Sequence, residues 1–293
     1  MKVFVTGGTG LIGHALVKRL LEDGHDVTVL TRQSLDSSEA VTYISSIDSL
    51  KTRQDIIINL AGASLADRRW SRAYKKEIRT SRIDLTQVLV SRLRKIGMPD
   101  LLISGSAIGI YGESKVRDFS ETDGVGSGFS AELCRDWEAS IGDIGSEDAR
   151  CVLLRTGVVL DKARGAYPQM TQSFRFGLAS WMGQGDHWLS WIHLTDMVGA
   201  IMHCIQNEAV SGPVNMTAPN PVTHRSFADE VRNVTTTVTG IGMPGWVIRL
   251  IVGEMADELL LVGQRVMPNK LLSTGYEFQF GELKNAIADI EAR

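Results

Sequence analysis

The sequence has few cysteines and no spacing that would pair them. Only three of the 293 residues are cysteine, Cys134, Cys151 and Cys204, and none stands in a C-x-x-C motif. An odd number of scattered thiols argues against the disulfide framework of a secreted protein. No His, Cys or acidic residues recur at the spacing of metal ligands. We therefore expect a protein of the reducing cytoplasm, without a metal site.

Long apolar runs and an excess of one charge are also missing. The longest apolar segment, residues 246–252, is interrupted by Arg249 and is too short to span a bilayer. No basic stretch precedes an apolar one near the start, so we expect no signal peptide. The net charge is −3, from 31 basic and 34 acidic residues, which is not the footprint of a nucleic-acid binder. We expect a small-molecule substrate, with no nucleic-acid partner and no membrane association.

Glycine is abundant, and its most informative use is at the N-terminus. Residues 2–5 are typical of a strand and residues 11–21 have helical periodicity, with a G-x-x-G-x-x-G array at the turn between them. Missing Cβ atoms let such a turn approach a pyrophosphate, whose charge the helix N-terminus favours. The alternative is an ordinary glycine turn, but its place between a strand and a helix favours a nucleotide site. The predicted cofactor-binding residues are Gly7, Thr9, Gly10, Leu11, Ile12 and Gly13.

The second strand, residues 26–32, bears on the choice of cofactor. NAD-binding proteins of this type carry an acidic residue at the end of that strand, about 20 residues past the glycines. Here the strand ends in Thr31 and Arg32. A guanidinium would pair with the 2′-phosphate of NADP, and no carboxylate is there to repel it. We predict that NADP(H) is preferred over NAD(H) and that Thr31 and Arg32 contact it; the alternative is a surface arginine.

Alternating strands and helices predict an α/β fold, a Rossmann-type doubly wound parallel sheet. The apolar run 55–62 reads as a central strand, whose end places Leu60, Ala61 and Gly62 beside the glycine turn. We assign residues 1–160 to a dinucleotide-binding domain, to which 196–218 return. Residues 161–195 and 219–293 form a smaller, mainly helical substrate-facing region. Within this frame we expect one helix over 70–96, strands over 101–104, 151–160 and 188–194, and a helix over 197–207 capped by Thr195 or Asp196.

With these elements placed, the chain resembles the extended and atypical short-chain dehydrogenase/reductases. The matching segments are residues 6–13, 59–62, 104–112, 154–157 and 191–196. More narrowly it resembles epimerase-family proteins, grouped with nucleoside-diphosphate-sugar epimerases, through residues 69–70 and 81–82 and the C-terminal segment 253–278. The resemblance implies an NADP-binding fold with an appended helical segment, and it adds Arg155 to the cofactor-binding residues. It also implies a homodimer formed by helices near 78–96 and 131–141.

The usual catalytic group of that superfamily is only partly present. Its members hold the substrate oxygen with a serine or threonine and use a Tyr-x-x-x-Lys pair as acid and base. Ser106 matches the serine, with Ser104 left open; a turn serine is the alternative. The resemblance puts Ser130 at the tyrosine position and Cys134 at the lysine position, so the pair is missing. A literal Tyr-x-x-x-Lys at Tyr111 falls in a loop, and we read that spacing as coincidence.

Two hypotheses follow from this incomplete site. The first is an NADP-dependent oxidoreductase or epimerase-like enzyme in which Ser106 hydrogen-bonds a substrate oxygen and Tyr111 acts alone as proton donor. Arg82 stands where the resemblance implies a proton-relaying asparagine, which departs further from the usual mechanism. The second hypothesis is therefore a sensor or regulatory protein that keeps the nucleotide fold without acid/base catalysis.

Overall fold

The fold is organised around a seven-stranded parallel sheet. The structure is a computed structural model that describes residues 1–142, 144, 149–235, 237 and 239–293. The strand order is β12-β7-β5-β4-β1-β2-β3, and every neighbouring pair is parallel. The predicted doubly wound parallel sheet is thus confirmed. The strands are β1 (Lys2–Thr6), β2 (Asp26–Leu30), β3 (Val41–Ile44), β4 (Ile56–Asn59), β5 (Leu101–Ala107), β7 (Arg150–Thr156) and β12 (Gly212–Met216).

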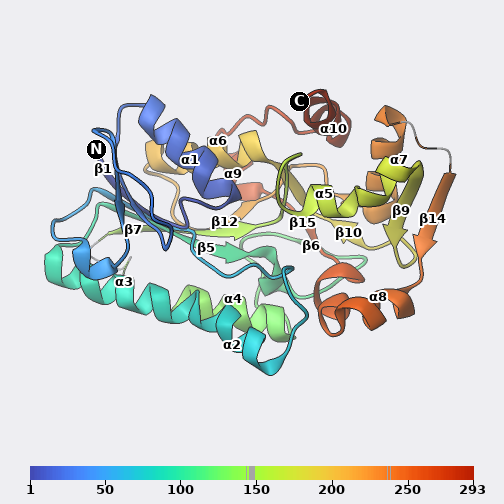
Figure 1. Cartoon of the computed structure of the whole chain (residues 1–293), viewed down its shortest axis with the longest axis horizontal. Coiled ribbons are helices and arrows are strands. Elements are labelled where there is room, and N and C mark those ends of the chain that lie inside the picture. The colour runs from blue at the N-terminus through green and yellow to red at the C-terminus, as the bar shows by residue number, and fades with distance from the viewer. Residues whose placement is uncertain (143, 145–148, 236, 238) are drawn as a thin grey trace.

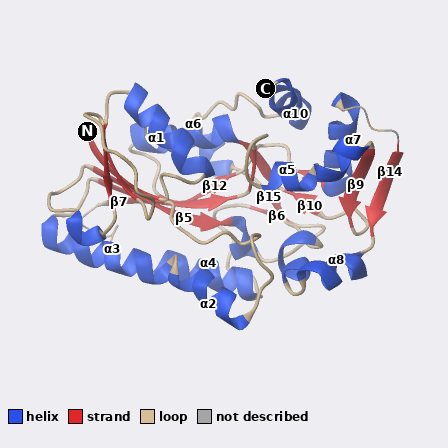
Figure 2. Cartoon of the chain, in the orientation of Figure 1, coloured by secondary structure: helices blue, strands red, loops and turns tan. Residues whose placement is uncertain are grey.

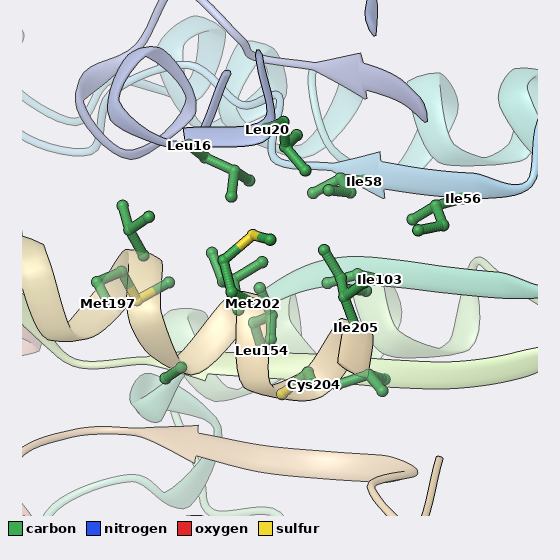
Figure 3. Packing of buried hydrophobic residues seen from close by; sticks show 14 of the residues in the cluster. Leu16, Leu20, Ile56, Ile58, Ile103, Leu154, Met197, Met202, Cys204 and Ile205 are labelled. Carbon is green, nitrogen blue, oxygen red and sulfur yellow. The ribbon is translucent and has the colours of Figure 1, made fainter. Parts of the chain in front are cut away.

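Helices cover both faces of this sheet (Figures 1 and 2). On one face lie α1 (Leu11–Glu22) and α6 (Leu194–Gln206), and on the other lie α3 (Ile83–Ile96) and α4 (Phe129–Ala139). All four residues of β4 are buried, as expected for a central strand covered on both sides. Figure 3 shows the α1–α6 side of the core, where Leu16 and Leu20 face the apolar side chains of β4 and β5. This packing fixes α1, and therefore the glycine turn before it, against the sheet.

A second, smaller group of elements lies beyond the C-terminal ends of the central strands, at the right of Figure 1. It has its own apolar cluster, which includes Tyr167, Trp191 and Phe227. Its strands pair two by two: β14 with β9, β10 with β13, β11 with β8, and β15 with β6. The elements are β6 (Asp118–Phe119), β8 (Val158–Leu160), α5 (Ala166–Met170), β9 (Leu178–Met182), β10 (Trp188–Leu189), β11 (Trp191–His193), β13 (Val222–Thr223), α7 (His224–Val234), β14 (Thr239–Met243), α8 (Gly245–Val252), β15 (Arg265–Val266) and α10 (Leu283–Ala292). Helix α9 (Asn269–Ser273) instead packs against β12, and its Leu271 belongs to the central apolar cluster.

Several predicted elements are divided in the structure. The helix expected over 70–96 is two helices, α2 (Arg72–Thr80) and α3, separated at Ser81 and Arg82. At the break the Ser81 hydroxyl accepts a hydrogen bond from the Ala63 N–H at 2.9 Å, a contact between residues 18 apart that ties the turn to the β4 loop. The strand expected over 151–160 becomes β7 and β8, and the one over 188–194 becomes β10 and β11. Strand β5 extends three residues beyond the predicted end, to Ala107.

The start of α6 also differs from the prediction. The helix begins at Leu194, and its cap is the imidazole Nδ1 of His193, which accepts from the Thr195 N–H at 3.1 Å. The carboxylate of Asp196 instead accepts from the backbone N–H groups of Gln279 and Phe280, both at 2.8 Å. Asp196 therefore holds the C-terminal chain. Within the described residues, none of the helices is both long and apolar enough to cross a membrane.

Candidate functional site: a dinucleotide crevice at the strand ends

The glycine turn between β1 and α1 leaves no room for side chains. Gly7 has φ +72°, and a Cβ there would lie 2.7 Å from the carbonyl carbon of Leu60. A Cβ on Gly13 would lie 2.2 Å from the Gly7 carbonyl oxygen. Gly10 is exposed and caps α1 without any side-chain hydrogen bond. A bare turn at a helix start fits the pyrophosphate of a dinucleotide.

A buried polar network fixes the end of β4 beside this turn. Thr6 donates to Asn59 Oδ1 at 2.6 Å, and its hydroxyl accepts from the Ala61 N–H at 3.2 Å. Asn59 Nδ2 donates to the hydroxyl of Thr86 at 2.8 Å. The loop 60–62 therefore has a fixed path along Gly7, as the sequence predicts, and Gly62 is exposed in the crevice.

The end of β2 offers a free guanidinium. Thr31 is buried, and its hydroxyl accepts from the Gln33 N–H at 3.1 Å, so it shapes the turn. Arg32 is exposed, and no carboxylate of the described residues lies within ion-pair distance of it. The guanidinium is thus available to an anionic group at this end of the crevice, such as a 2′-phosphate.

Three predicted site residues, Ser106, Tyr111 and Arg155, belong to one buried network. Arg155 forms a bidentate pair with Glu138, from Nε to Oε1 at 2.9 Å and from Nη2 to Oε2 at 3.0 Å. Ser106 donates to the same carboxylate at 2.7 Å. Tyr111 accepts from Arg155 Nη1 at 2.9 Å and donates to Asn215 Oδ1 at 2.6 Å. All of these donors are therefore engaged inside the protein.

The electrostatics of this network favour a fixed arrangement. Burial raises the pKa of Tyr111, although the hydrogen bond from Arg155 opposes the shift, so the phenol keeps its proton at neutral pH. Burial disfavours the charge on Arg155, but hydrogen bonds to Glu138 and Tyr111 raise its pKa above the usual value. Tyr111 can donate to a substrate only after it leaves Asn215. The catalytic roles of Ser106 and Tyr111, and the cofactor role of Arg155, stay predictions.

The positions that the resemblance gives to tyrosine and lysine hold Ser130 and Cys134, one turn apart on α4. The Ser130 hydroxyl is buried, with no hydrogen-bond partner in the part of the chain that the structure describes. Burial raises the pKa of Cys134 to about 11, so its thiol is neutral at physiological pH. A neutral buried thiol is a poor nucleophile.

Two arginines at the crevice were not predicted as cofactor contacts. Arg164, in the loop after β8, has its Nη1 3.5 Å from the Thr9 carbonyl oxygen and so overlies the glycine turn. Arg82, between α2 and α3, packs its guanidinium against Gly62. Arg164 carries no sequence signal, because its approach to the turn comes from the path of a loop more than 150 residues away in sequence. The feature that marks Arg82 as a candidate contact is that it is a cation near the end of β4 without a carboxylate beside it.

The C-terminal segment contacts two elements next to the candidate site, α4 and the chain after β5. The carboxylate of Glu258 accepts from the N–H groups of Phe129 and Ser130, at 3.2 and 3.1 Å, and so caps α4. Gln264 donates to the Ile108 carbonyl at 3.1 Å, and β15 pairs with β6. The segment therefore supports both α4 and the chain that follows β5.

The aromatic and histidine residues near this segment are mainly structural. Trp191 is fully buried and donates to the Asn220 carbonyl at 3.0 Å, while His193 caps α6 and lies 3.2 Å from Asp289. The rings of His187 and His224 lie in a tilted contact with centroids 4.5 Å apart, and both residues are buried. Burial, with a smaller effect of His187, lowers the pKa of His224 to about 3, and burial also lowers the pKa of His187. Both imidazoles are therefore neutral in the folded protein at neutral pH.

Acid should destabilise the protein through this pair. Between the folded pKa of His224, about 3, and the unfolded value, about 6.5, the unfolded state binds more protons. The neutral His224 therefore contributes its full stabilisation above about pH 6.5. Below that pH the free energy of unfolding falls by up to ~1.4 kcal/mol per pH unit. Urea titrations from about pH 7.5 to about pH 4.5 measure this slope. The slope should be shallower in His224→Phe; an equal slope in both proteins would contradict the assignment.

Comparison with known proteins places this arrangement in a family. Residues 3–131 match the NAD dependent epimerase/dehydratase family, and residues 243–290 match a domain of unknown function, DUF1731. An epimerase family protein of Mycobacterium bovis is 38% identical over 289 residues, covering 97% of this chain and 96% of its own length. The mouse epimerase family protein SDR39U1 is 34% identical, with all of both chains covered.

Solved structures agree with the sequence relatives. The crystal structure of human epimerase family protein SDR39U1 (isoform 2), determined with NADPH, superposes with a TM-score of 0.92 at 32% identity, covering 100% of both chains. A UDP-glucuronic acid 4-epimerase from Bacillus cereus has a TM-score of 0.78 at 15% identity, which shows the common fold alone. With its glycine turn, its doubly wound sheet and its C-terminal segment, the chain belongs to the epimerase family of short-chain dehydrogenase/reductase-like proteins, in the group that carries the DUF1731 domain.

Proposed function

We propose that this protein binds NADP(H) in the strand-end crevice and acts as an oxidoreductase or epimerase-like enzyme on a small carbonyl, hydroxyl or nucleotide-sugar substrate. The observation that carries the proposal is the turn at Gly7 and Gly13, where any Cβ would strike backbone atoms. The NADPH in the related human structure supports it. A bound nicotinamide supplies hydride transfer, while the protein positions it and excludes water.

The preference for NADP(H) over NAD(H) rests on Arg32. Its guanidinium is exposed at the end of β2, where a dinucleotide of this fold places the adenosine ribose. Arginine binds phosphate oxygens through two parallel hydrogen bonds, which NAD(H) cannot offer because it lacks the 2′-phosphate. The side chains of this chain that would hold the cofactor are therefore Arg32 at the 2′-phosphate and the turn 7–13 at the pyrophosphate.

Replacing Arg32 by alanine should weaken NADPH binding by about 10- to 100-fold, because a hydrogen-bonded charge pair contributes ~1.5–3 kcal/mol. NADH affinity should stay within about twofold, since that ligand has no group for Arg32 to bind. Titration of nicotinamide fluorescence measures both affinities. The matched control is Arg232→Ala, an exposed arginine of α7 outside the sheet, which should change neither affinity. Equal weakening of NADPH and NADH in Arg32→Ala would remove Arg32 from cofactor selection.

A sensor without catalysis is the second candidate, and one observation favours it. The neutral Cys134 stands where a lysine would be, and the phenol of Tyr111 is engaged with Asn215. Oxidation of NADPH in the presence of simple carbonyl compounds distinguishes the two candidates. Slow but saturable turnover that falls in Ser106→Ala at unchanged NADPH affinity supports the enzyme. Tight NADPH binding without turnover, over a broad set of carbonyls, supports the sensor.

A further inference from the structure

The described residues contain two buried guanidinium groups with opposite surroundings. Arg155 is 6% exposed and pairs with Glu138 through two hydrogen bonds. Arg82 is 9% exposed, but none of the described carboxylates lies within ion-pair distance of it. Its side-chain hydrogen bond to protein runs from Nη1 to the Ile78 carbonyl, at 3.2 Å. An unpaired buried cation costs free energy, and such groups concentrate at binding sites.

The guanidinium of Arg82 packs against Gly62 and Trp137. A Cβ at Gly62 would lie 2.8 Å from its Cζ and 3.1 Å from both terminal nitrogens. Its Cζ also lies 5.2 Å from the ring centroid of Trp137. A guanidinium packed in this way still donates through the N–H groups along its edge. Gly62 is itself exposed and follows Leu60 and Ala61, whose backbone lies against Gly7, so the guanidinium packs next to the glycine turn.

The backbone of Arg82 is tied to the centre of the sheet. Its carbonyl accepts from the Thr86 hydroxyl at 2.6 Å, and Thr86 in turn accepts from Asn59 at the end of β4. The sheet order puts β4 and β5 on one side of β1 and β2 on the other. Arg82 and Arg32 therefore lie on opposite sides of the glycine turn. A dinucleotide crosses such a crevice with one mononucleotide half on each side.

We propose that Arg82 binds the nicotinamide-ribose half of the dinucleotide, with its free N–H groups donating to hydroxyl and carboxamide oxygens. This inference rests on the proposed NADP(H) binding. A guanidinium can only donate, and that half of the cofactor offers acceptors along its length. The neighbouring residue at the lysine position, Cys134, is a neutral thiol and brings no competing charge. Arg82 is then the cation that anchors the reactive end of the cofactor.

The test compares two ligands that differ only in the nicotinamide-ribose half. NADPH contains this half, whereas 2′-phospho-ADP keeps the adenosine, the 2′-phosphate and both bridging phosphates but lacks the nicotinamide ribose. Isothermal titration of both ligands is carried out on wild type, Arg82→Met and Arg82→Lys. Arg94→Met, an exposed arginine of α3, is the matched control. Urea unfolding of each variant shows whether the fold is retained.

We expect Arg82→Met to weaken NADPH by about 10- to 100-fold and 2′-phospho-ADP by less than about twofold. Arg82→Lys should lose less, because it keeps the charge but not the planar fork. Equal losses for both ligands, or no loss for either, would overturn the inference. If Arg82→Met does not fold, the same comparison on Arg82→Lys decides. A wild-type protein that binds neither ligand would overturn the proposed function itself, whereas tight NADPH binding indifferent to Arg82 overturns only this inference.

Discussion

Replacing Gly13 by alanine should weaken NADPH binding by about 100-fold or more, ~2.7 kcal/mol, and lower the free energy of unfolding by about 1–3 kcal/mol. The new Cβ would lie 2.2 Å from the Gly7 oxygen and 2.7 Å from the Gly8 Cα. Both are backbone atoms and cannot rotate away, so α1 must move off the turn. The N–H groups at its start would then no longer converge on a phosphate. NADPH titration and urea unfolding measure the two effects.

The control for this substitution is Gly124→Ala. A Cβ at Gly124 would meet nothing within 4 Å, and Gly124 is not among the glycines with positive φ. It should leave both NADPH affinity and unfolding close to wild type. A Gly13→Ala protein that binds NADPH as well as Gly124→Ala does would contradict the close packing described for the turn.

Replacing Glu138 by leucine should be the most destabilising single change, lowering the free energy of unfolding by about 3–5 kcal/mol. The substitution leaves the buried guanidinium of Arg155 without its counter-charge and the Ser106 hydroxyl without its acceptor. Removing one member of a buried ion pair costs more than the pair contributes, because the remaining charge cannot return to water. Urea unfolding at neutral pH gives the value.

Two further variants separate this mechanism from a general effect of altering α4. Glu132→Leu, at an exposed position on the same helix, should cost less than about 1 kcal/mol. The double variant Glu138→Leu/Arg155→Met should be more stable than Glu138→Leu, because no charge is left uncompensated. If Glu138→Leu costs no more than Glu132→Leu, the network is not the structural link that its geometry indicates.

Local patterns predict most of the central sheet, because short-range physics determines it. Residues 2–21 combine a strand, a glycine turn and a helix period, and the structure places β1 and α1 accordingly. The run at 56–59 is buried on both faces of the sheet, which an unbroken apolar pattern predicts. Predictions fail where a long-range contact decides: Ser81 ends α2 by capping the Ala63 N–H, and Gly157 ends β7 where a Cβ would lie 2.6 Å from the Ser190 oxygen.

Only part of the candidate site can likewise be predicted from local sequence patterns. The phosphate-binding turn can be predicted, since glycines at fixed spacing have one geometric use there. The network of Ser106, Tyr111 and Arg155 cannot, because it depends on Glu138 and Asn215, which the fold brings together from α4 and β12. Matching Ser106 to a family motif gives its position on β5 but not the partner to which it donates. The sequence alone does not mark Arg82 as a cofactor contact, because the lack of a nearby carboxylate is seen only in the three-dimensional structure.

Calorimetric titration of the wild-type protein with NADPH, followed by the same titration with NADH, tests whether the glycine turn binds a dinucleotide. We predict saturable binding of one NADPH per chain, clearly tighter than that of NADH. A folded protein that takes up neither nucleotide at millimolar concentration would contradict it, because the turn at Gly7 to Gly13 would then be only a means of packing α1 against β1.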